Sequence, residues 1–141
     1  MKTCISNAKY LFLAFIISFA LSYCGNNESL VNAQIEKGQA LYERGLYRDA
    51  IQFWEKALKI SSDNYRLHFY IAKAYQQLTQ FDTSTRHLKQ VIAHKNDDID
   101  AYLMMIQNNL YSGRYETAKQ ISADLEARHP GNANVSALRG D

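Results

Sequence analysis

Residues that break helices are scarce in this sequence. The 141-residue chain has one proline and six glycines, while the helix-favouring residues Ala, Leu, Gln, Lys and Glu are frequent after residue 30. Cysteine is equally scarce: only Cys4 and Cys24 are present, so residues 25–141 cannot form a disulfide. A content of 47% hydrophobic and 21% charged residues is typical of a globular protein. The sequence therefore predicts a single all-α domain held together by its core.

A strong charge of either sign is also missing. The formal net charge of +2 includes Lys2 and Lys9, and residues 24–141 contain fourteen Lys and Arg against fourteen Asp and Glu. Binding to nucleic acid normally needs a concentrated basic face that displaces counterions from phosphates. No such cluster stands out, so the sequence argues against a nucleic-acid-binding protein.

The first 23 residues have the features of a signal peptide. Lys2 and Lys9 accompany an apolar stretch that runs from Tyr10 to Leu21. Twelve residues form a helix of roughly 18 Å, which is too short for the roughly 30 Å hydrocarbon layer of a membrane. A cleaved signal peptide is therefore favoured over a permanent membrane span.

The segment Leu21-Ser22-Tyr23-Cys24-Gly25 resembles a bacterial lipobox, although Tyr23 stands where that pattern has a small residue. The resemblance implies cleavage before Cys24, acylation of this cysteine, a short linker at 24–30 and a membrane-anchored lipoprotein of the bacterial cell envelope. Gly25 in place of an aspartate favours the outer membrane over the inner one. The alternative is an ordinary signal peptide cut after Ala20, which would leave Cys24 as an unmodified thiol.

A period of 34 residues runs through the rest of the chain. The rows 31–64, 65–98 and 99–132 align without an insertion. The aligned positions are Gly38, Leu41, Gly45, Tyr47, Ala50, Trp54, Ala57 and Leu58 in the first row, Ala72, Tyr75, Thr79, Phe81, Ser84, Leu88, Val91 and Ile92 in the second, and Ile106, Asn109, Gly113, Tyr115, Ala118, Ser122, Leu125 and Glu126 in the third. This pattern of small, aromatic and alanine positions, with Pro130 near its end, resembles the tetratricopeptide (TPR) repeat.

The resemblance implies three helix-turn-helix repeats that form a short right-handed solenoid. We expect helices near residues 31–44, 48–61, 65–78, 82–95, 99–112 and 115–129. Gly45 and Gly113 suit the positive backbone angle that ends the first helix of a pair. The alternative is a generic helical bundle, because Leu, Ala and Tyr at helical spacing also mark an ordinary core. Three rows in register favour the repeat.

In the TPR family the first helix of each pair lines a groove that binds partner proteins. The matching positions predict a partner-binding groove made of Ile35, Gln39, Tyr42, Phe69, Lys73, Gln76, Leu103, Gln107 and Tyr111. Further lining positions are Asn32, Glu43, Arg66, Gln77, Asp100 and Leu110. Aromatic and amide side chains of this kind suit an extended or helical protein segment with apolar anchors.

Chaperone-binding members of the family hold a terminal carboxylate with a clamp of Lys, Asn and Arg. This clamp is missing here, since the matching positions are Ile35, Gln39, Tyr70, Asp100 and Met104. Asp100 would repel a carboxylate. The resemblance therefore implies a protein partner, but not a chaperone tail.

Motifs that carry catalysis or hold a cofactor are absent. The sequence has no Gly-rich phosphate loop, nucleophile elbow or HExxH motif. The four histidines, His68, His87, His94 and His129, have no cysteine or carboxylate partner at metal-ligand spacing, and His68 is interpreted as a packed side chain. We therefore expect a non-enzymatic scaffold, without metal or cofactor, that supports assembly of envelope or secretion complexes.

Two further interpretations stay open at this point. An accessory to, or weak member of, the cell-wall polymer-processing enzymes would act through Asp97, Asp98 and Asp100, although carboxylates here also suit the start of a helix. The segment 133–141 is only a short cap, built around Val135 and Leu138. We therefore expect the apolar edge near Ile121 and Leu125 to be partly covered by a partner or a second copy of the chain.

Overall fold

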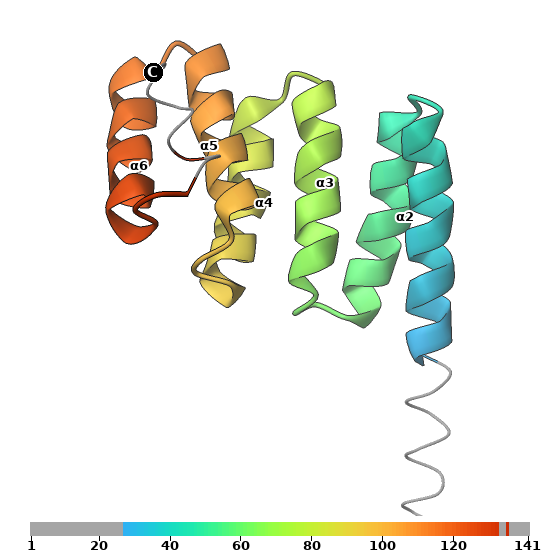
Figure 1. Cartoon of the computed structure of the whole chain (residues 1–141). Coiled ribbons are helices and arrows are strands. Elements are labelled where there is room, and N and C mark those ends of the chain that lie inside the picture. The colour runs from blue at the N-terminus through green and yellow to red at the C-terminus, as the bar shows by residue number, and fades with distance from the viewer. Residues whose placement is uncertain (1–26, 133–134, 136–141) are drawn as a thin grey trace, which may run out of the picture.

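The computed structural model describes residues 27–132 and residue 135, and these described residues contain helices and turns only. A first helix at residues 27–43 is followed by α2 (Tyr47–Ile60), α3 (Tyr65–Gln77), α4 (Phe81–His94), α5 (Ile99–Tyr111) and α6 (Tyr115–Arg128) (Figure 1). The all-α prediction is confirmed. From α2 onward the expected helix boundaries are also confirmed to within a residue or so.

The first helix differs from the expectation at its amino-terminal side. Residues 27–30 are helical, whereas the sequence placed them in a linker at 24–30. Nothing in Asn-Glu-Ser-Leu breaks a helix, and the buried side chain of Val31 holds this end of the helix on the core. The expected signal peptide, the lipidation site Cys24 and the capping residue Leu138 lie outside the described residues.

The helices form three antiparallel pairs that stack next to one another (Figure 1). The first helices of the pairs are 27–43, α3 and α5, and the second helices are α2, α4 and α6. Helix α3 contacts both α2 and α4, while α5 contacts both α4 and α6. The three predicted helix pairs are thus confirmed. Within the described ranges, none of the helices has the length and apolar character needed to cross a membrane.

Each first helix ends in the same turn. Gly45, Thr79 and Gly113 have φ values of 76°, 58° and 72°, as the sequence predicted for the two glycines. In each turn the following residue donates its backbone N–H to a carbonyl five residues earlier, over 2.8–2.9 Å. This bond satisfies one of the carbonyls that the helix end leaves free. Because Thr79 is β-branched, its positive φ is a strained backbone angle.

Replacing Thr79 by glycine should stabilise the protein by about 1 kcal/mol, because glycine adopts a positive φ without steric cost. The side chain of Thr79 is exposed and bonds only to the carbonyl of Leu78, so little packing is lost. Urea unfolding of the full chain would show a higher midpoint with an unchanged slope. A midpoint below that of the wild type would mean that the threonine side chain stabilises this turn.

The core is built where large side chains meet small ones. Trp54 is 1% exposed, and its indole lies directly against Gly38 of the first helix. The indole Nε1 donates a hydrogen bond to the carbonyl of Ile35 over 3.2 Å. Tyr70 of α3 stacks on Trp54, with ring centroids 5.5 Å apart. An aromatic contact is therefore added to the mostly aliphatic cluster that joins the first two helix pairs.

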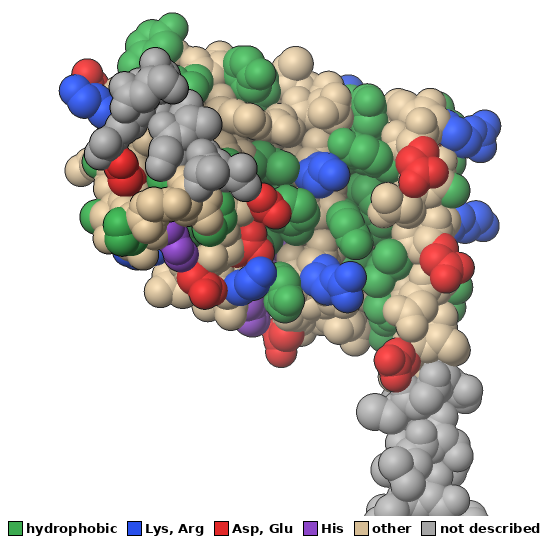
Figure 2. All heavy atoms as spheres, viewed as in Figure 1, with side chains coloured by type: hydrophobic (Ala, Val, Ile, Leu, Met, Phe, Trp, Pro, Cys, Tyr) green, Lys and Arg blue, Asp and Glu red, His purple; other side chains and the backbone are tan. Residues whose placement is uncertain are grey.

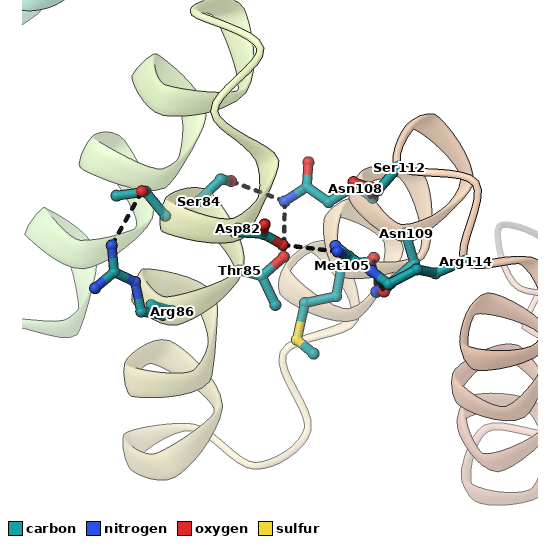
Figure 3. Close-up of polar contacts among 10 residues, drawn as sticks. Asp82, Ser84, Thr85, Arg86, Met105, Asn108, Asn109, Ser112 and Arg114 are labelled. Atoms are coloured by element: carbon teal, nitrogen blue, oxygen red, sulfur yellow. Dashed lines mark hydrogen bonds and ion pairs between the residues drawn. The ribbon is translucent and has the colours of Figure 1, made fainter.

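The junction between the second and third pairs combines an apolar cluster with a buried polar network. Asn108 of α5 is fully buried, and its Nδ2 donates to Ser84 Oγ over 2.8 Å and to Thr85 Oγ1 over 3.4 Å (Figure 3). Its Oδ1 accepts a hydrogen bond from Gln76 Nε2 over 2.9 Å. Nearby, Arg114 pairs with Asp82 over 2.8 Å. Helices α3, α4 and α5 are thus linked through one buried amide.

The expected exposure at Ile121 and Leu125 was wrong. Leu125 is fully buried, and Val135, only 2% exposed, belongs to the same cluster as Tyr102, Ile106 and Leu125. Ile121 is half-buried against the same cluster. The chain's own Val135 therefore contributes to covering this region, which the sequence had assigned to a partner.

Candidate functional site

The surface formed by 27–43, α3 and α5, called here the first-helix face, contains the predicted groove positions. Figure 2 shows hydrophobic side chains gathered between 27–43 and α3, with Lys and Arg over α3 and Asp and Glu both toward α5 and over the helix 27–43. The charges of residues 24–141, which balance in number, are therefore unevenly distributed over this face. A surface with apolar and charged groups side by side can bind a protein segment through both kinds of contact.

The part of this face between 27–43 and α3 is closed by its own side chains. Lys73 Nζ lies 5.5 Å from the centroid of the Tyr42 ring, which is within the range of a cation–π contact. Tyr42 also contacts Tyr47 edge to face, with centroids 5.2 Å apart. The space left beside Gln39, Tyr42 and Lys73 is about 10 Å³, close to the minimum for one water molecule. The predicted groove is therefore shallow at this position.

The Tyr42 hydroxyl lies in an environment that favours its neutral form. Burial raises its pKa, the nearby Tyr47 raises it further, and a hydrogen bond with Gln77 partly offsets the two. Tyr42 consequently remains an uncharged ring at neutral pH. It serves here as a packing surface for Lys73 and as a hydrogen-bonding group.

A hollow of about 300 Å³ opens between α3 and α5, close to their amino-terminal ends. We call it the α3–α5 hollow. Its lining residues are Tyr65, Arg66, Phe69, Tyr70, Val91, Lys95, Asp98 and Asp100. This volume is at the lower end of the range found for ligand pockets, so the hollow can accept one large side chain rather than a whole folded element.

The sequence predicted only part of this hollow. Phe69 was among the nine expected groove residues, and Arg66 and Asp100 were further lining positions. Tyr65, Tyr70 and Lys95 were missed as groove residues, because counting helical positions selects one line along each helix and neglects the ends of α3 and α4. The row alignment did contain a signal for Tyr70, since it stands at one of the clamp positions.

The remaining predicted groove residues have varied surroundings. Ile35 and Leu103 are half-buried and pack against the core clusters. Gln76 is turned toward α5, where it bonds to Asn108 and, over 3.5 Å, to Gln107. Tyr111 is 68% exposed and stacks on Phe81 of α4, with ring centroids 5.3 Å apart. Ile35, Leu103 and Gln76 thus contribute to packing between helices, whereas Tyr111 presents much of its ring to solvent.

Of the three acidic residues near the start of α5, Asp97, Asp98 and Asp100, one has a clear structural role. Asp98 accepts a hydrogen bond from the backbone N–H of Ala101 over 3.0 Å, so it caps the helix. It also pairs with Lys95 over 3.2 Å. This accounts for Asp98 without a catalytic role. Asp100 belongs to the first turn of α5 and is exposed.

A pair of histidines joins α3 to α4. The Nδ1 atoms of His68 and His87 are 3.0 Å apart, and His87 stacks on Tyr75 with ring centroids 5.7 Å apart. At this distance one Nδ1 donates a hydrogen bond and the other accepts it. The two Nδ1 atoms therefore cannot both carry a proton while this contact is kept. Within the described residues, no group of three or more metal-ligating side chains surrounds them. Their geometry is that of a hydrogen-bonded packing contact.

Both histidines resist protonation. Burial lowers the pKa of His87 to about 4, with further lowering by His68 and Arg86. Burial also lowers the pKa of His68, the charge of His94 adds to the effect, and a hydrogen bond with the backbone of Ser62 opposes it. Both rings are therefore neutral at pH 7, in keeping with the packed role that the sequence suggested for His68.

A family model described as TPR repeat matches residues 38–78, which cover the end of the first helix, α2 and α3. The chain carries the tetratricopeptide-repeat fold. The TPR domain of Arabidopsis OM64 superposes with a TM-score of 0.71 at 20% identity, over 81% of this chain and 94% of that one. The second TPR domain of human RPAP3, in complex with the HSP70 peptide SGPTIEEVD, gives 0.69 at 18% identity over 79% and 92%.

A bacterial structure is similar as well. The type III secretion translocator chaperone SycD of Yersinia enterocolitica superposes with a TM-score of 0.67 at 14% identity, over 78% of this chain and 86% of that one. No curated protein sequence matches the chain significantly. At these identities the solved structures establish the TPR fold, and the predicted repeat resemblance is confirmed at this level.

Proposed function

We propose that this TPR protein is a non-enzymatic scaffold that binds a segment of a partner protein on its first-helix face. The observation that carries the proposal is the α3–α5 hollow, where aromatic side chains lie beside charged groups on the face that includes the predicted groove. Helical repeats offer extended surfaces of this kind more readily than enclosed catalytic pockets. The RPAP3 domain in complex with an HSP70 peptide supports the proposal by analogy of fold.

We further propose that the scaffold is a lipoprotein of the bacterial cell envelope, anchored through Cys24 and more suited to the outer than to the inner membrane. The support is the lipobox-like segment that ends at Cys24 and Gly25. Anchoring would hold the repeats near a membrane surface, where they would support assembly of an envelope or secretion complex. A single acyl chain gives only marginal membrane binding, so stable anchoring needs a second chain or another membrane-binding signal.

We also propose that the protein associates with a second copy of itself through a different surface. A largely apolar hollow of about 450 Å³ lies between α5 and α6 and is lined by Ile106, Leu110, Tyr115 and Ala118 among others. Leu110 is 44% exposed and Tyr115 is 67% exposed. Exposed apolar groups gathered in one place favour association, and here they replace the Ile121 and Leu125 edge expected from the sequence.

Site-specific photocrosslinking in cells tests the partner-binding proposal. A photoreactive residue is introduced at the exposed positions Gln39 and Gln107 of the first-helix face, and at Gln52 of α2 as the matched control. We expect one defined protein to be captured from the first two positions and not from the third. Equal capture from Gln52 would move the binding surface away from the first-helix face, and capture of a second copy would identify self-association instead.

The same cells test the anchor. Replacing Cys24 by serine should release the protein from the membrane fraction, and fatty-acid labelling of the protein should disappear. Membrane association and labelling that persist in the variant would contradict anchoring at Cys24. Release without any labelling of the wild type would contradict lipidation as its cause.

A further inference from the structure

The α3–α5 hollow has unpaired charges of opposite sign on its two sides. Arg66 belongs to α3 and Asp100 to α5, and neither takes part in an ion pair or a hydrogen bond among the described residues. The other two charges at the hollow, Lys95 and Asp98, are paired with each other over 3.2 Å. Arg66 and Asp100 are therefore the two charges available to a ligand.

The apolar lining between these charges is aromatic and aliphatic. Phe69 and Tyr70 come from α3, and the fully buried Val91 comes from α4. Phe69 is half-buried against the cluster that contains Val91 and Met105, so its ring is fixed by packing. A ring held in this way offers contact area at a low cost in conformational entropy. The hollow therefore suits one large apolar side chain with a charged neighbour on each side.

We propose that the α3–α5 hollow binds a partner segment in which an aromatic or large apolar residue is flanked by an acidic residue on the α3 side and a basic residue on the α5 side. This inference rests on the proposed partner-binding function and specifies the chemistry of the partner. The ring enters beside Phe69 and Tyr70. The acidic neighbour pairs with Arg66, and the basic neighbour pairs with Asp100. Both side chains are exposed, so each pair contributes more to selectivity than to affinity.

Asp100 makes the hollow unsuited to a partner segment that carries only acidic residues. A peptide such as SGPTIEEVD, which is bound in the RPAP3 structure, carries carboxylates and no basic residue at its end. Carboxylates placed next to Asp100 would be repelled, and like charges of this kind are an effective means of rejecting a wrong partner. The hollow thus selects by the order of charges along the segment as well as by the ring.

Selection from a displayed library of random twelve-residue peptides tests the inference on the full chain. The wild type should enrich peptides with an aromatic or large apolar residue between an acidic and a basic residue. Asp100→Arg should reverse the preference on the α5 side, from basic to acidic, and Asp100→Asn should abolish it. A synthetic peptide from the wild-type selection should bind Asp100→Arg about tenfold more weakly, which corresponds to about 1.4 kcal/mol.

Gln52→Arg is the control, because it introduces the same arginine side chain at an exposed position of α2 outside the hollow. This control should select the same peptides as the wild type. An unchanged preference in Asp100→Arg would overturn the inference, while peptide binding on the first-helix face would stand. If the wild type enriches no peptide, or if Gln52→Arg changes the selection as much as Asp100→Arg, both the inference and the proposed function are wrong.

Discussion

Replacing Gly38 by alanine should destabilise the protein by about 3 kcal/mol, although alanine is usually the better residue inside a helix by about 1 kcal/mol. A Cβ at this position would lie 2.3 Å from Trp54 Nε1 and 2.6 Å from Trp54 Cδ1. The indole cannot easily move away, because it is buried, contacts the rings of Tyr42 and Tyr70 and bonds to the carbonyl of Ile35. Urea unfolding should show the loss as a lower midpoint.

Two comparisons separate this overlap from other effects of the substitution. Gly45→Ala should cost only about 1 kcal/mol, because Gly45 has a positive φ but nothing within 4 Å of the added Cβ. In a Trp54→Leu background, Gly38→Ala should cost much less, since leucine lacks the rigid indole ring whose Nε1, Cδ1 and Cε2 atoms would meet the added Cβ. A Gly38→Ala protein as stable as the wild type would refute the close approach of the two helices.

Acidification should weaken the protein between about pH 6.5 and pH 4 through the pair His68 and His87. The folded protein holds His87 with a pKa of about 4, whereas an unfolded histidine titrates near 6.5. The unfolded state therefore binds more protons in this interval, so stability is full above pH 6.5 and falls as the pH drops toward 4. Because His87 is partly accessible to solvent, we expect a loss of about 1–2 kcal/mol from this group.

His87→Gln provides the test, because glutamine keeps a hydrogen-bonding group next to His68 and does not titrate. The free energy of unfolding should be measured at several pH values for both proteins. The variant should lose less stability than the wild type between pH 6.5 and pH 4. Above pH 7 the free energy of unfolding should change with pH in nearly the same way in both proteins. Parallel curves over the whole interval would show that this histidine pair does not govern the acid response.

The helix pairs could be predicted from the sequence because the 34-residue spacing reports on packing directly. Small residues such as Gly38 and Ala50 recur where helices approach, and Gly45 and Gly113 recur where the chain must turn left-handed. Thr79 shows the limit of this reasoning. Its side chain gives no local sign of a positive φ, and only the register with the two glycines places it in the same turn.

The site was harder to predict than the fold, because a surface depends on which side chains satisfy one another. Gln76 has the composition expected of a groove residue, yet the buried Asn108 engages it as a hydrogen-bond partner. Tyr42 and Lys73 were expected to face a ligand, yet they contact each other. Arg66 and Asp100 could be identified as the charges available to a ligand only because Lys95 and Asp98 are paired with each other. Such pairings depend on three-dimensional distances, which the sequence does not give.

The buried amide of Asn108 makes the helix pairs non-interchangeable. One row earlier, at the corresponding junction, Ala74 and Ala50 stand in place of Asn108 and Ser84, and both are fully buried. If α5 docked on the first pair, its Asn108 amide would be buried among apolar groups. If α3 docked on the second pair, Ser84 would lose its hydrogen-bond partner. Each unpaired polar group of this kind costs about 1–3 kcal/mol. Repeats of similar shape thus have a fixed order, which disfavours exchange of pairs between neighbouring molecules during folding.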